Sequence, residues 1–341
     1  MDTLTHALSG ALLNRAAAPR QPTPAQLPSG ARTAVGFLAA AFPDIDIILV
    51  WVDPLTYLNW HRAYTHSLIL LPAWALILAS VFRWALRRRY PLRAFYGVCV
   101  LALAAHIAGD VITAYGTRVL VPLSDVRVSL PTTFIIDPWF TAIIALGLLG
   151  SIAWRSNRVA AAGIALLIAY VGVQGAWYVK ALALARGYAS DNGLSPSGAH
   201  ALPQPFLPVH WKLVVDDGET YRQAHIRLLG GALAPAADRP WWLRMAAAYR
   251  PPGELNWTTV ERYGTENPRF AREAWRRPEL AAFRQFAVFP YVYRLKRSAD
   301  EHCAWFTDLR FTLEGMTPPF RYGACRTEDS GAWRLNRLGR W

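Results

Sequence analysis

Long apolar segments separated by arginine-bearing loops occupy the first 180 residues, and they restrict this half of the chain to a membrane-embedded helical bundle. A helix needs roughly 20 apolar residues to cross the hydrocarbon layer. The segments predicted to be long enough are Leu68–Leu86, Ala94–Tyr115, Pro138–Trp154 and Val159–Leu184. Two earlier segments, Thr3–Leu13 and Val35–Val52, are short or interrupted, and we expect them to be only partly inserted.

The positive charge of the chain is carried almost entirely by arginine. The formal net charge is +13, and lysine occurs only at Lys180, Lys212 and Lys296. In the first half much of this charge lies in short loops between apolar segments, which is the pattern of the positive-inside rule. A basic chain can also bind nucleic acid, but this distribution favours a multi-pass protein of a bacterial-type inner (plasma) membrane, with the lipid bilayer as its partner and no nucleic acid.

The composition changes near Arg186, where proline, aspartate and tryptophan become frequent and apolar runs become short. Asp216-Asp217-Gly218 is a hairpin signal between two strand-like runs. The strands expected in this half are Val209–Val215, Tyr221–Leu228, Val288–Leu295, Cys303–Leu313 and Phe320–Arg326, with an amphipathic helix at Phe270–Phe286. The predicted fold class is therefore mainly α, with a polytopic transmembrane helical bundle over residues 1–185 and a smaller extracytoplasmic β-rich α+β domain over residues 186–341.

Histidine and aspartate residues recur in the apolar half, where burying such groups is costly and usually marks function. They are His6, Asp44, Asp46, His61, His66, His106 and Asp110. Those with a basic residue on the same segment lie 9 to 17 positions from it, or roughly 13–26 Å along a helix at about 1.5 Å per residue. An up-and-down bundle with its arginines at one end would therefore bring all of these groups to the other end.

Imidazole and carboxylate groups together form the ligand set of zinc, manganese or iron. His106 and Asp110 are four residues apart and share one helix face. Asp44 and Asp46 follow Pro43, where the chain is expected to leave a helix, and Thr65 is placed to cap a helix that begins near His66.

Each of these groups taken alone also has a structural interpretation. A single histidine can be packed and hydrogen-bonded, Asp44 can end a helix, and His106 with Asp110 can form a neutral helix pair. Asp137 before Pro138 fits a helix N-cap as well as a ligand. Structural polar residues have no reason to share one depth, however, so the pattern as a whole favours a site for one or two metal ions.

The same residues carry a family resemblance over about residues 1–180. The matching stretches are Asp2-Thr3-Leu4-Thr5-His6 with Gly10, Pro43-Asp44-Ile45-Asp46, His61-Arg62-Ala63-Tyr64-Thr65-His66-Ser67, His106-Ile107-Ala108-Gly109-Asp110, Thr113-Ala114-Tyr115-Gly116-Thr117 and Asp137-Pro138. In these motifs the chain resembles the YdjM-like family of membrane-bound, inner-membrane metal-dependent hydrolases. The resemblance implies a helical hydrolase whose site is similar to that of zinc-dependent phospholipase C and P1 nuclease.

Carried over by position, the resemblance implies one set of metal ligands and one set of groups that are either ligands or proton-transfer groups. The ligands are His6, Asp44, His61, His106 and Asp110, and the second set is Asp46 and His66. Phospholipase C sites also use a helix that bears histidine and glutamate, and Pro138–Leu184 contains no such pair. We therefore expect one or two zinc ions and not three.

The reaction expected from this site is hydrolysis of a phosphoester or lipid-linked substrate by metal-activated water at the outer membrane face. Asp46 or His66 would accept the proton, and Arg62 would hold an anionic group or, equally, act as an interfacial anchor. Two other classes stay open: a metal-stabilised regulatory or assembly protein without turnover, and a proton-coupled transporter, which the lack of internal repeats disfavours.

The arginine loops also predict the orientation of the chain. They belong inside, which puts the metal site and the second domain outside. There Cys303 and Cys325 would form a disulfide or stay as two free thiols.

Overall fold

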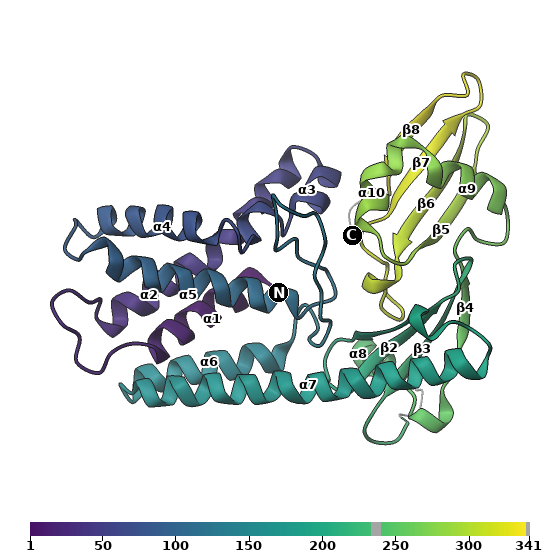
Figure 1. Ribbon diagram of the computed structural model, residues 1–341. Coiled ribbons are helices and arrows are strands. Elements are labelled where there is room, and N and C mark those ends of the chain that lie inside the picture. Colours follow the sequence, from purple (N-terminus) through teal and green to yellow (C-terminus); the bar gives the residue numbers. More distant parts are fainter. Residues whose placement is uncertain (233–239, 339–341) are drawn as a thin grey trace. The chain divides into compact units, whose positions relative to one another are not determined.

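The computed structural model describes residues 1–232 and 240–338, and it divides into two compact units (Figure 1). Unit 1 is Met1–Ala176 and unit 2 is Trp177–Trp341. The fold class is confirmed, because an α-helical half with apolar helices precedes a half built from two antiparallel sheets. The expected division at residues 185 and 186 falls inside α7 (Asn157–Asp191), a helix that continues from unit 1 into unit 2.

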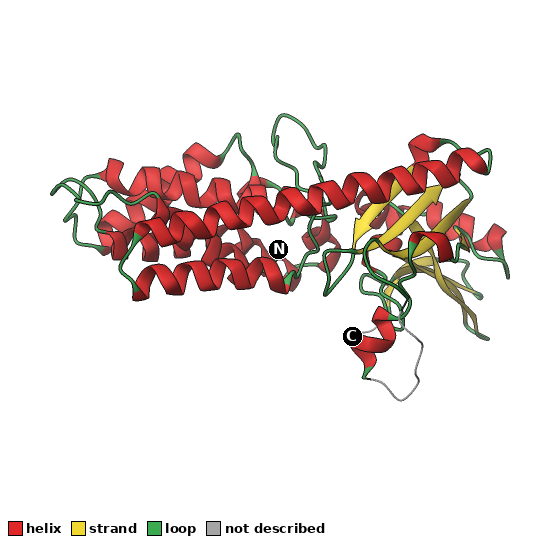
Figure 2. Ribbon diagram, turned by 90° about the horizontal axis from the view of Figure 1, so that it is seen from below, coloured by secondary structure: helices red, strands yellow, loops and turns green. Residues whose placement is uncertain are grey.

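Unit 1 is an up-and-down bundle whose helices lie side by side in both views (Figures 1 and 2). Its helices are α1 (Thr3–Ala16), α2 (Ser29–Ala41), α4 (Leu71–Ala85), α5 (Leu92–Val111), α6 (Pro138–Ala153) and the first part of α7. At the end marked N in Figure 1, the short elements η1 (Phe42–Trp51), α3 (Pro54–Trp60) and η2 (Tyr64–His66) connect α2 to α4.

Three helical stretches are long and apolar enough to cross a membrane among the described residues, namely Ser29–Trp51, Leu92–Val111 and Asn157–Asp191. Pro54–His66 and Leu71–Ala85 form a pair bent by 78° that would count as a fourth. Three expectations differ from this result. Leu68–Leu86 is not long enough by itself, because α4 begins only at Leu71 and has 15 residues. Val35–Val52 belongs to a full-length stretch, because Pro43 sits in the first turn of η1, where its missing N–H breaks no hydrogen bond. Pro138–Ala153 has only 16 residues, since Asp137 caps its start and a turn at Trp154 ends it.

The expected helix start near His66 is wrong. The chain makes only one turn of 3₁₀-helix there, and α4 begins at Leu71. Thr65 does not cap a helix, because its Oγ1 lies 3.4 Å from Asp46 Oδ2 and 2.9 Å from His66 Nδ1. The turn before α4 is instead held by Ser67, whose Oγ accepts hydrogen bonds from the backbone N–H groups of Ile69 and Leu70.

α1 and α2 cross in close backbone contact through two glycines. A Cβ added to Gly36 would lie 2.6 Å from Gly10 O and 2.7 Å from Asn14 Nδ2. A Cβ added to Gly10 would overlap Ala40 Cβ and Gly36 O. The crossing sets the position of His6, one turn before Gly10 on α1.

Gly10→Ala is therefore expected to lower the free energy of unfolding of unit 1 by about 1–3 kcal/mol, because the helices must separate to admit the methyl group. Thermal unfolding of the detergent-purified protein measures this change. The matched control is Gly97→Ala in α5, where an added Cβ meets no atom within 4 Å. Equal unfolding temperatures for the two variants would contradict the close-contact explanation.

Unit 2 contains two four-stranded antiparallel sheets with strand orders β1-β2-β3-β4 and β5-β6-β7-β8 (Figure 2). The strands are β1 (Ala199–Pro203), β2 (His210–Asp216), β3 (Thr220–Arg227), β4 (Thr258–Glu261), β5 (Pro290–Arg297), β6 (Glu301–Asp308), β7 (Tyr322–Thr327) and β8 (Trp333–Arg337). The remaining elements are α8 (Trp241–Ala246), α9 (Pro268–Arg276), α10 (Ala281–Phe286) and the 3₁₀ turns η3 (Pro196–Gly198), η4 (Pro252–Glu254), η5 (Pro278–Leu280) and η6 (Leu309–Phe311).

Most sequence expectations for unit 2 hold. β2 and β3 pair across the Asp216-Asp217-Gly218 turn, where Gly218 has a φ of 96°. The single helix expected at Phe270–Phe286 is wrong, because Pro278 divides it into α9 and α10. Cys303 and Cys325 face each other on β6 and β7 and are joined in a disulfide.

Lys212 is buried in unit 2 and ties β2 to the turn that follows β6. Its Nζ donates hydrogen bonds to Leu309 O at 3.1 Å and to the Oγ1 of Thr312 at 2.7 Å. Burial removes the ammonium group from water and lowers the pKa of Lys212 from 10.5 to about 7, although the nearby Asp308 carboxylate partly opposes this shift.

The stability of unit 2 is expected to rise with pH between about 7 and 9. The unfolded chain, with a lysine pKa of 10.5, binds more protons there than the folded chain, with a lysine pKa of about 7. The slope has an upper limit of about 1.4 kcal/mol per pH unit. Urea unfolding of the full-length protein, followed by ¹⁹F NMR of 5-fluorotryptophan at the neighbouring Trp211, measures it. Lys212→Met should remove the slope, and an equal slope in that variant would refute the assignment to Lys212.

Candidate metal centre

Three ligand-type atoms from two segments, η2 and α5, converge at the end of unit 1 where η1, α3 and η2 lie. His66 Nε2 and His106 Nε2 are 2.9 Å apart, and Asp110 Oδ2 lies 3.2 Å and 3.4 Å from them. A tetrahedral ion with ligands at about 2.0–2.1 Å would separate neighbouring ligand atoms by about 3.4 Å. The two separations that involve Asp110 are close to this value, and the two imidazole nitrogens lie about 0.5 Å closer to each other than this.

Asp44 and His6 extend this cluster. Asp44 Oδ1 lies 3.7 Å from both His66 Nε2 and His106 Nε2. His6 stacks on the His106 ring with centroids 3.7 Å apart, and ligand atoms of His6, Asp44 and His106 lie within 4.8 Å of one another. Gly109 makes room for His6, since a Cβ there would come within 3.2 Å of the imidazole. The structure thus holds two overlapping groups of three ligands that share His106.

The hydrogen bonds of the two central imidazoles fix where their protons are. His106 Nδ1 lies 2.6 Å from Ala40 O, which only accepts, so Nδ1 carries the hydrogen. Thr65 donates to Asp46 and therefore accepts from His66 Nδ1. With both Nδ1 atoms protonated, the Nε2 atoms of the neutral rings carry lone pairs. These lone pairs face each other and the oxygen of Asp110, and they would repel unless a proton or a metal cation lay between them.

Two buried carboxylate oxygens in the cluster have no hydrogen-bond partner among the residues that the structure describes. They are Asp44 Oδ2 and Asp110 Oδ2. A buried carboxylate oxygen without a donor is costly, and in proteins it is normally paired or bound to a metal. The donor set, two imidazole nitrogens with carboxylate oxygens, fits zinc or a similar transition metal.

Asp46 and His61 form a second pair beside this cluster. Asp46 Oδ1 lies 2.8 Å from His61 Nδ1, and Asp46 Oδ2 accepts the backbone N–H of Arg62 at 3.1 Å. Asp46 Oδ2 is also 3.6 Å from His66 Nδ1. Asp46 therefore contacts His61 directly and His66 through the hydroxyl of Thr65, as a carboxylate that orients metal-binding histidines does. His61 belongs to neither group of three ligands.

Arg62 is buried against the cluster and does not lie at the interface as an anchor. It is only 2% exposed, its Nη2 pairs with Asp110 Oδ1 at 2.9 Å, and its Nη1 donates to Thr113 Oγ1 at 2.8 Å. Its guanidinium carbon lies 4.7 Å from the centre of the Tyr115 ring. Its backbone has a φ of 60°, an uncommon conformation for a residue other than glycine.

Access to the cluster is on the side of Asp44 and His61. Their side chains are each 12% exposed, whereas those of His66, His106 and Asp110 are completely buried. Apolar side chains on the neighbouring η1 and α3 are exposed, namely Ile45, Ile47, Ile48, Trp51, Val52 and Trp60. Exposed tryptophan side chains such as Trp51 and Trp60 are typical of the membrane interface.

The structure brings all seven histidines and aspartates expected at the site to one end of the bundle. His6, Asp44, His66, His106 and Asp110 form the two groups of three ligands, and Asp46 with His61 lies next to them. Their roles as ligands or proton acceptors stay predictions. Thr113 and Tyr115, which hold Arg62, were not identified as site residues, although both lie in the Thr113–Thr117 motif.

Comparisons with known proteins place the helical half in a known family. A stretch of 186 residues is 30% identical to "Uncharacterized protein YfhP" of Bacillus subtilis (strain 168), covering 53% of this chain and 54% of that protein. The match thus spans about half the length of that relative. No solved structure matches the chain. Residues 1–181 match the model of the YdjM inner membrane protein family, and the chain therefore belongs to that family.

Proposed function

We propose that this protein is a membrane-bound metal-dependent hydrolase that binds zinc, as one or two ions, through His6, Asp44, His66, His106 and Asp110. The observation that carries the proposal is the convergence of two imidazole lone pairs and an unpartnered carboxylate oxygen within 2.9–3.4 Å of one another. His66 is assigned as a ligand because its Nε2 faces this centre.

A zinc ion held there would supply an acidic water and would polarise a phosphoryl oxygen. The residues of the chain provide the other parts of a hydrolytic site. His61, oriented by Asp46 and partly exposed, is the proposed proton acceptor. Arg62, whose Nε lacks a hydrogen-bond partner among the described residues, is the group proposed to attract an anionic part of the substrate.

The proposed substrate class is a phosphoester that is lipid-linked or amphipathic. The exposed apolar side chains of η1 and α3 support this choice, since they provide a surface for a hydrocarbon chain beside the polar cluster. A site of this kind, like those of phospholipase C and P1 nuclease, would act on a head group at the membrane surface.

The test begins with elemental analysis of the full-length protein purified in detergent without chelators. Zinc near one or two equivalents, together with hydrolysis of bis-p-nitrophenyl phosphate or a phosphatidyl substrate, is the expected result. Stoichiometric zinc without turnover on a broad ester panel would replace the hydrolase with a metal-stabilised regulatory or assembly protein. Absence of any bound metal would end both proposals and favour a proton-coupled transporter.

We also propose that the metal centre and unit 2 face the extracytoplasmic side. The disulfide between Cys303 and Cys325 supports this orientation, because such bonds persist in oxidising compartments. A cysteine introduced at the exposed Ser197 should be modified by a membrane-impermeant thiol reagent in intact cells, whereas Cys303 and Cys325 are buried and do not compete for the reagent. Modification only after lysis would reverse the orientation.

A further inference from the structure

The arginine-bearing end of unit 1 holds a pocket of about 640 Å³. It lies between the α1–α2 connection and the α6–α7 turn, at the end of the bundle opposite to the N label in Figure 1. Its lining includes Arg15, Arg20, Arg155 and Arg158 and, among the described residues, no acidic side chain. The volume is in the range of small-molecule sites, about 300–1,000 Å³.

Two helix N-termini open into this pocket. α2 begins at Ser29 without a side-chain cap, and α7 begins at Asn157. Both residues line the pocket, and the Oγ of Ser29 is 3.4 Å from Asn157 Oδ1. The amide of Asn157 donates to Ala18 O, which ties the α6–α7 turn to the α1–α2 connection. Free backbone N–H groups and the helix dipole make each of these ends attractive to anions.

Arg15 gives an independent sign that a ligand belongs there. Its side chain is only 8% exposed, its Nη2 donates to Ser151 O at 2.8 Å, and its buried Nε has no hydrogen-bond partner. None of the four arginines forms an ion pair with any residue that the structure describes. A buried guanidinium N–H without an acceptor is costly, and because Arg15 lines the pocket, an anion bound there would offset the charge of this group.

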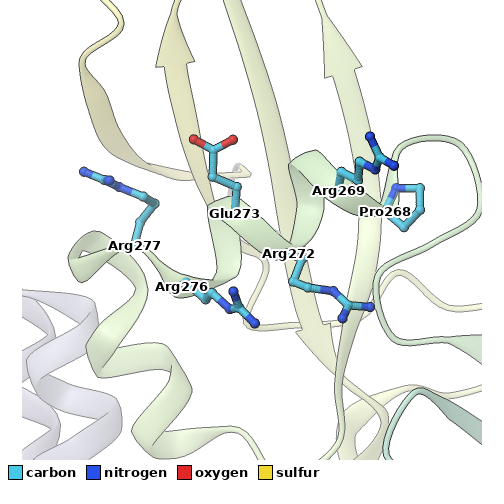
Figure 3. Close-up of a pocket in the computed structure, with 6 residues that line it drawn as sticks. All are labelled: Pro268, Arg269, Arg272, Glu273, Arg276 and Arg277. Atoms are coloured by element: carbon cyan, nitrogen blue, oxygen red, sulfur yellow. The ribbon is translucent and has the colours of Figure 1, made fainter.

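A second arginine-rich groove, along α9 in unit 2, lacks these properties (Figure 3). Glu273 lies among its arginines, Arg272 is paired with Glu219 at 2.7 Å, and Arg277 is 3.6 Å from Glu279. Its charges come from one helix and are already balanced in part, as on an ordinary solvated surface.

We infer that the pocket between the α1–α2 connection and the α6–α7 turn binds a phosphoryl anion, either free phosphate or the phosphate of an anionic lipid head group. Guanidinium groups and helix amides form charge-assisted hydrogen bonds with phosphate oxygens, and basic pockets between membrane helices bind anionic head groups. This site is separate from the metal centre and does not depend on the proposed hydrolase activity.

The test uses the full-length protein in neutral detergent with two probes, inorganic phosphate and dioleoylphosphatidylglycerol. Isothermal titration measures phosphate binding, and native mass spectrometry measures retained lipid. The pocket variant is Arg155→Asn with Arg158→Gln, in which asparagine suits the φ of 47° at residue 155. The matched control is Arg88→Asn with Arg89→Gln, which removes the same charge from the α4–α5 turn, where Arg88 has a φ of 57°.

At least one probe is expected to bind with one-to-one stoichiometry, and the pocket variant should weaken it by about tenfold or more, while the control changes it less than twofold. Phosphate binding alone identifies a soluble anion, and retained phosphatidylglycerol identifies a lipid head group. Gly30→Leu should also block binding while keeping every charge, because an added Cβ there meets no atom within 4 Å and leads into the pocket. Binding of neither probe, or equal weakening by both arginine variants, would overturn the inference.

Discussion

Asp110→Asn is expected to reduce zinc affinity by more than about 100-fold, the largest effect of any single substitution in unit 1. The change keeps the shape of the side chain but removes the charge of a group that lies 3.2 Å from His66 Nε2 and 3.4 Å from His106 Nε2. Elemental analysis of the purified variant and titration with zinc measure the loss.

Asp110 also forms an ion pair with Arg62. Replacing the Asp110 carboxylate with an amide leaves the buried Arg62 guanidinium without a counter-charge and lowers the stability of the fold. His106→Gln separates the loss of zinc affinity from the loss of stability. His106 has no contact with Arg62 among the interactions described above, and its removal should still lower zinc affinity. Asp137→Asn is the matched control, since Asp137 is a buried helix cap that accepts from Trp139 and Phe140 outside the cluster. Full zinc occupancy in Asp110→Asn would refute the proposed centre.

Asp46→Asn is expected to lower turnover of a phosphodiester by roughly 10²–10⁴-fold while zinc affinity falls by no more than about tenfold. The carboxylate accepts from His61 Nδ1 at 2.8 Å, so its neutralisation leaves the proposed proton acceptor without its orienting partner. Steady-state kinetics and zinc analysis on the same preparation distinguish this result from loss of the metal.

The control for Asp46 is Asp53→Asn. Asp53 lies seven positions later and caps α3 through Thr56, and asparagine serves equally well as an N-cap. Equal losses of turnover in the two variants would mean that the segment, and not the Asp46 carboxylate, is responsible.

The convergence of the histidines and aspartates was predictable because it follows from helix geometry alone. His106 and Asp110 lie on one face of α5, and the bundle alternates direction at each arginine-bearing turn. The pairing of each aspartate was not predictable. It depends on η1 and η2, whose 3₁₀ geometry decides that Asp46 reaches His61 and that Asp44 reaches His66.

The strands of unit 2 were also predictable only in part. The hairpin of β2 and β3 was predictable because its turn residues are specific. β1, β4 and β8 were missed, since each has only four or five residues and is a strand mainly because a neighbouring strand pairs with it. Arg62 was interpreted from its charge, and its burial against Asp110 and Thr113 depends on tertiary packing that the sequence does not reveal.

The donor groups of the candidate centre come from α1, η1, η2 and α5, which are spread from residue 6 to residue 110. No chain that is still incomplete before residue 110 holds the full set, because His6 is synthesised about a hundred residues before Asp110. Capture of the ion would therefore be a late event in biogenesis. A chain in which any one of these four segments is misplaced would keep acidic groups uncompensated within the bilayer, a defect that membrane quality-control proteases are suited to detect.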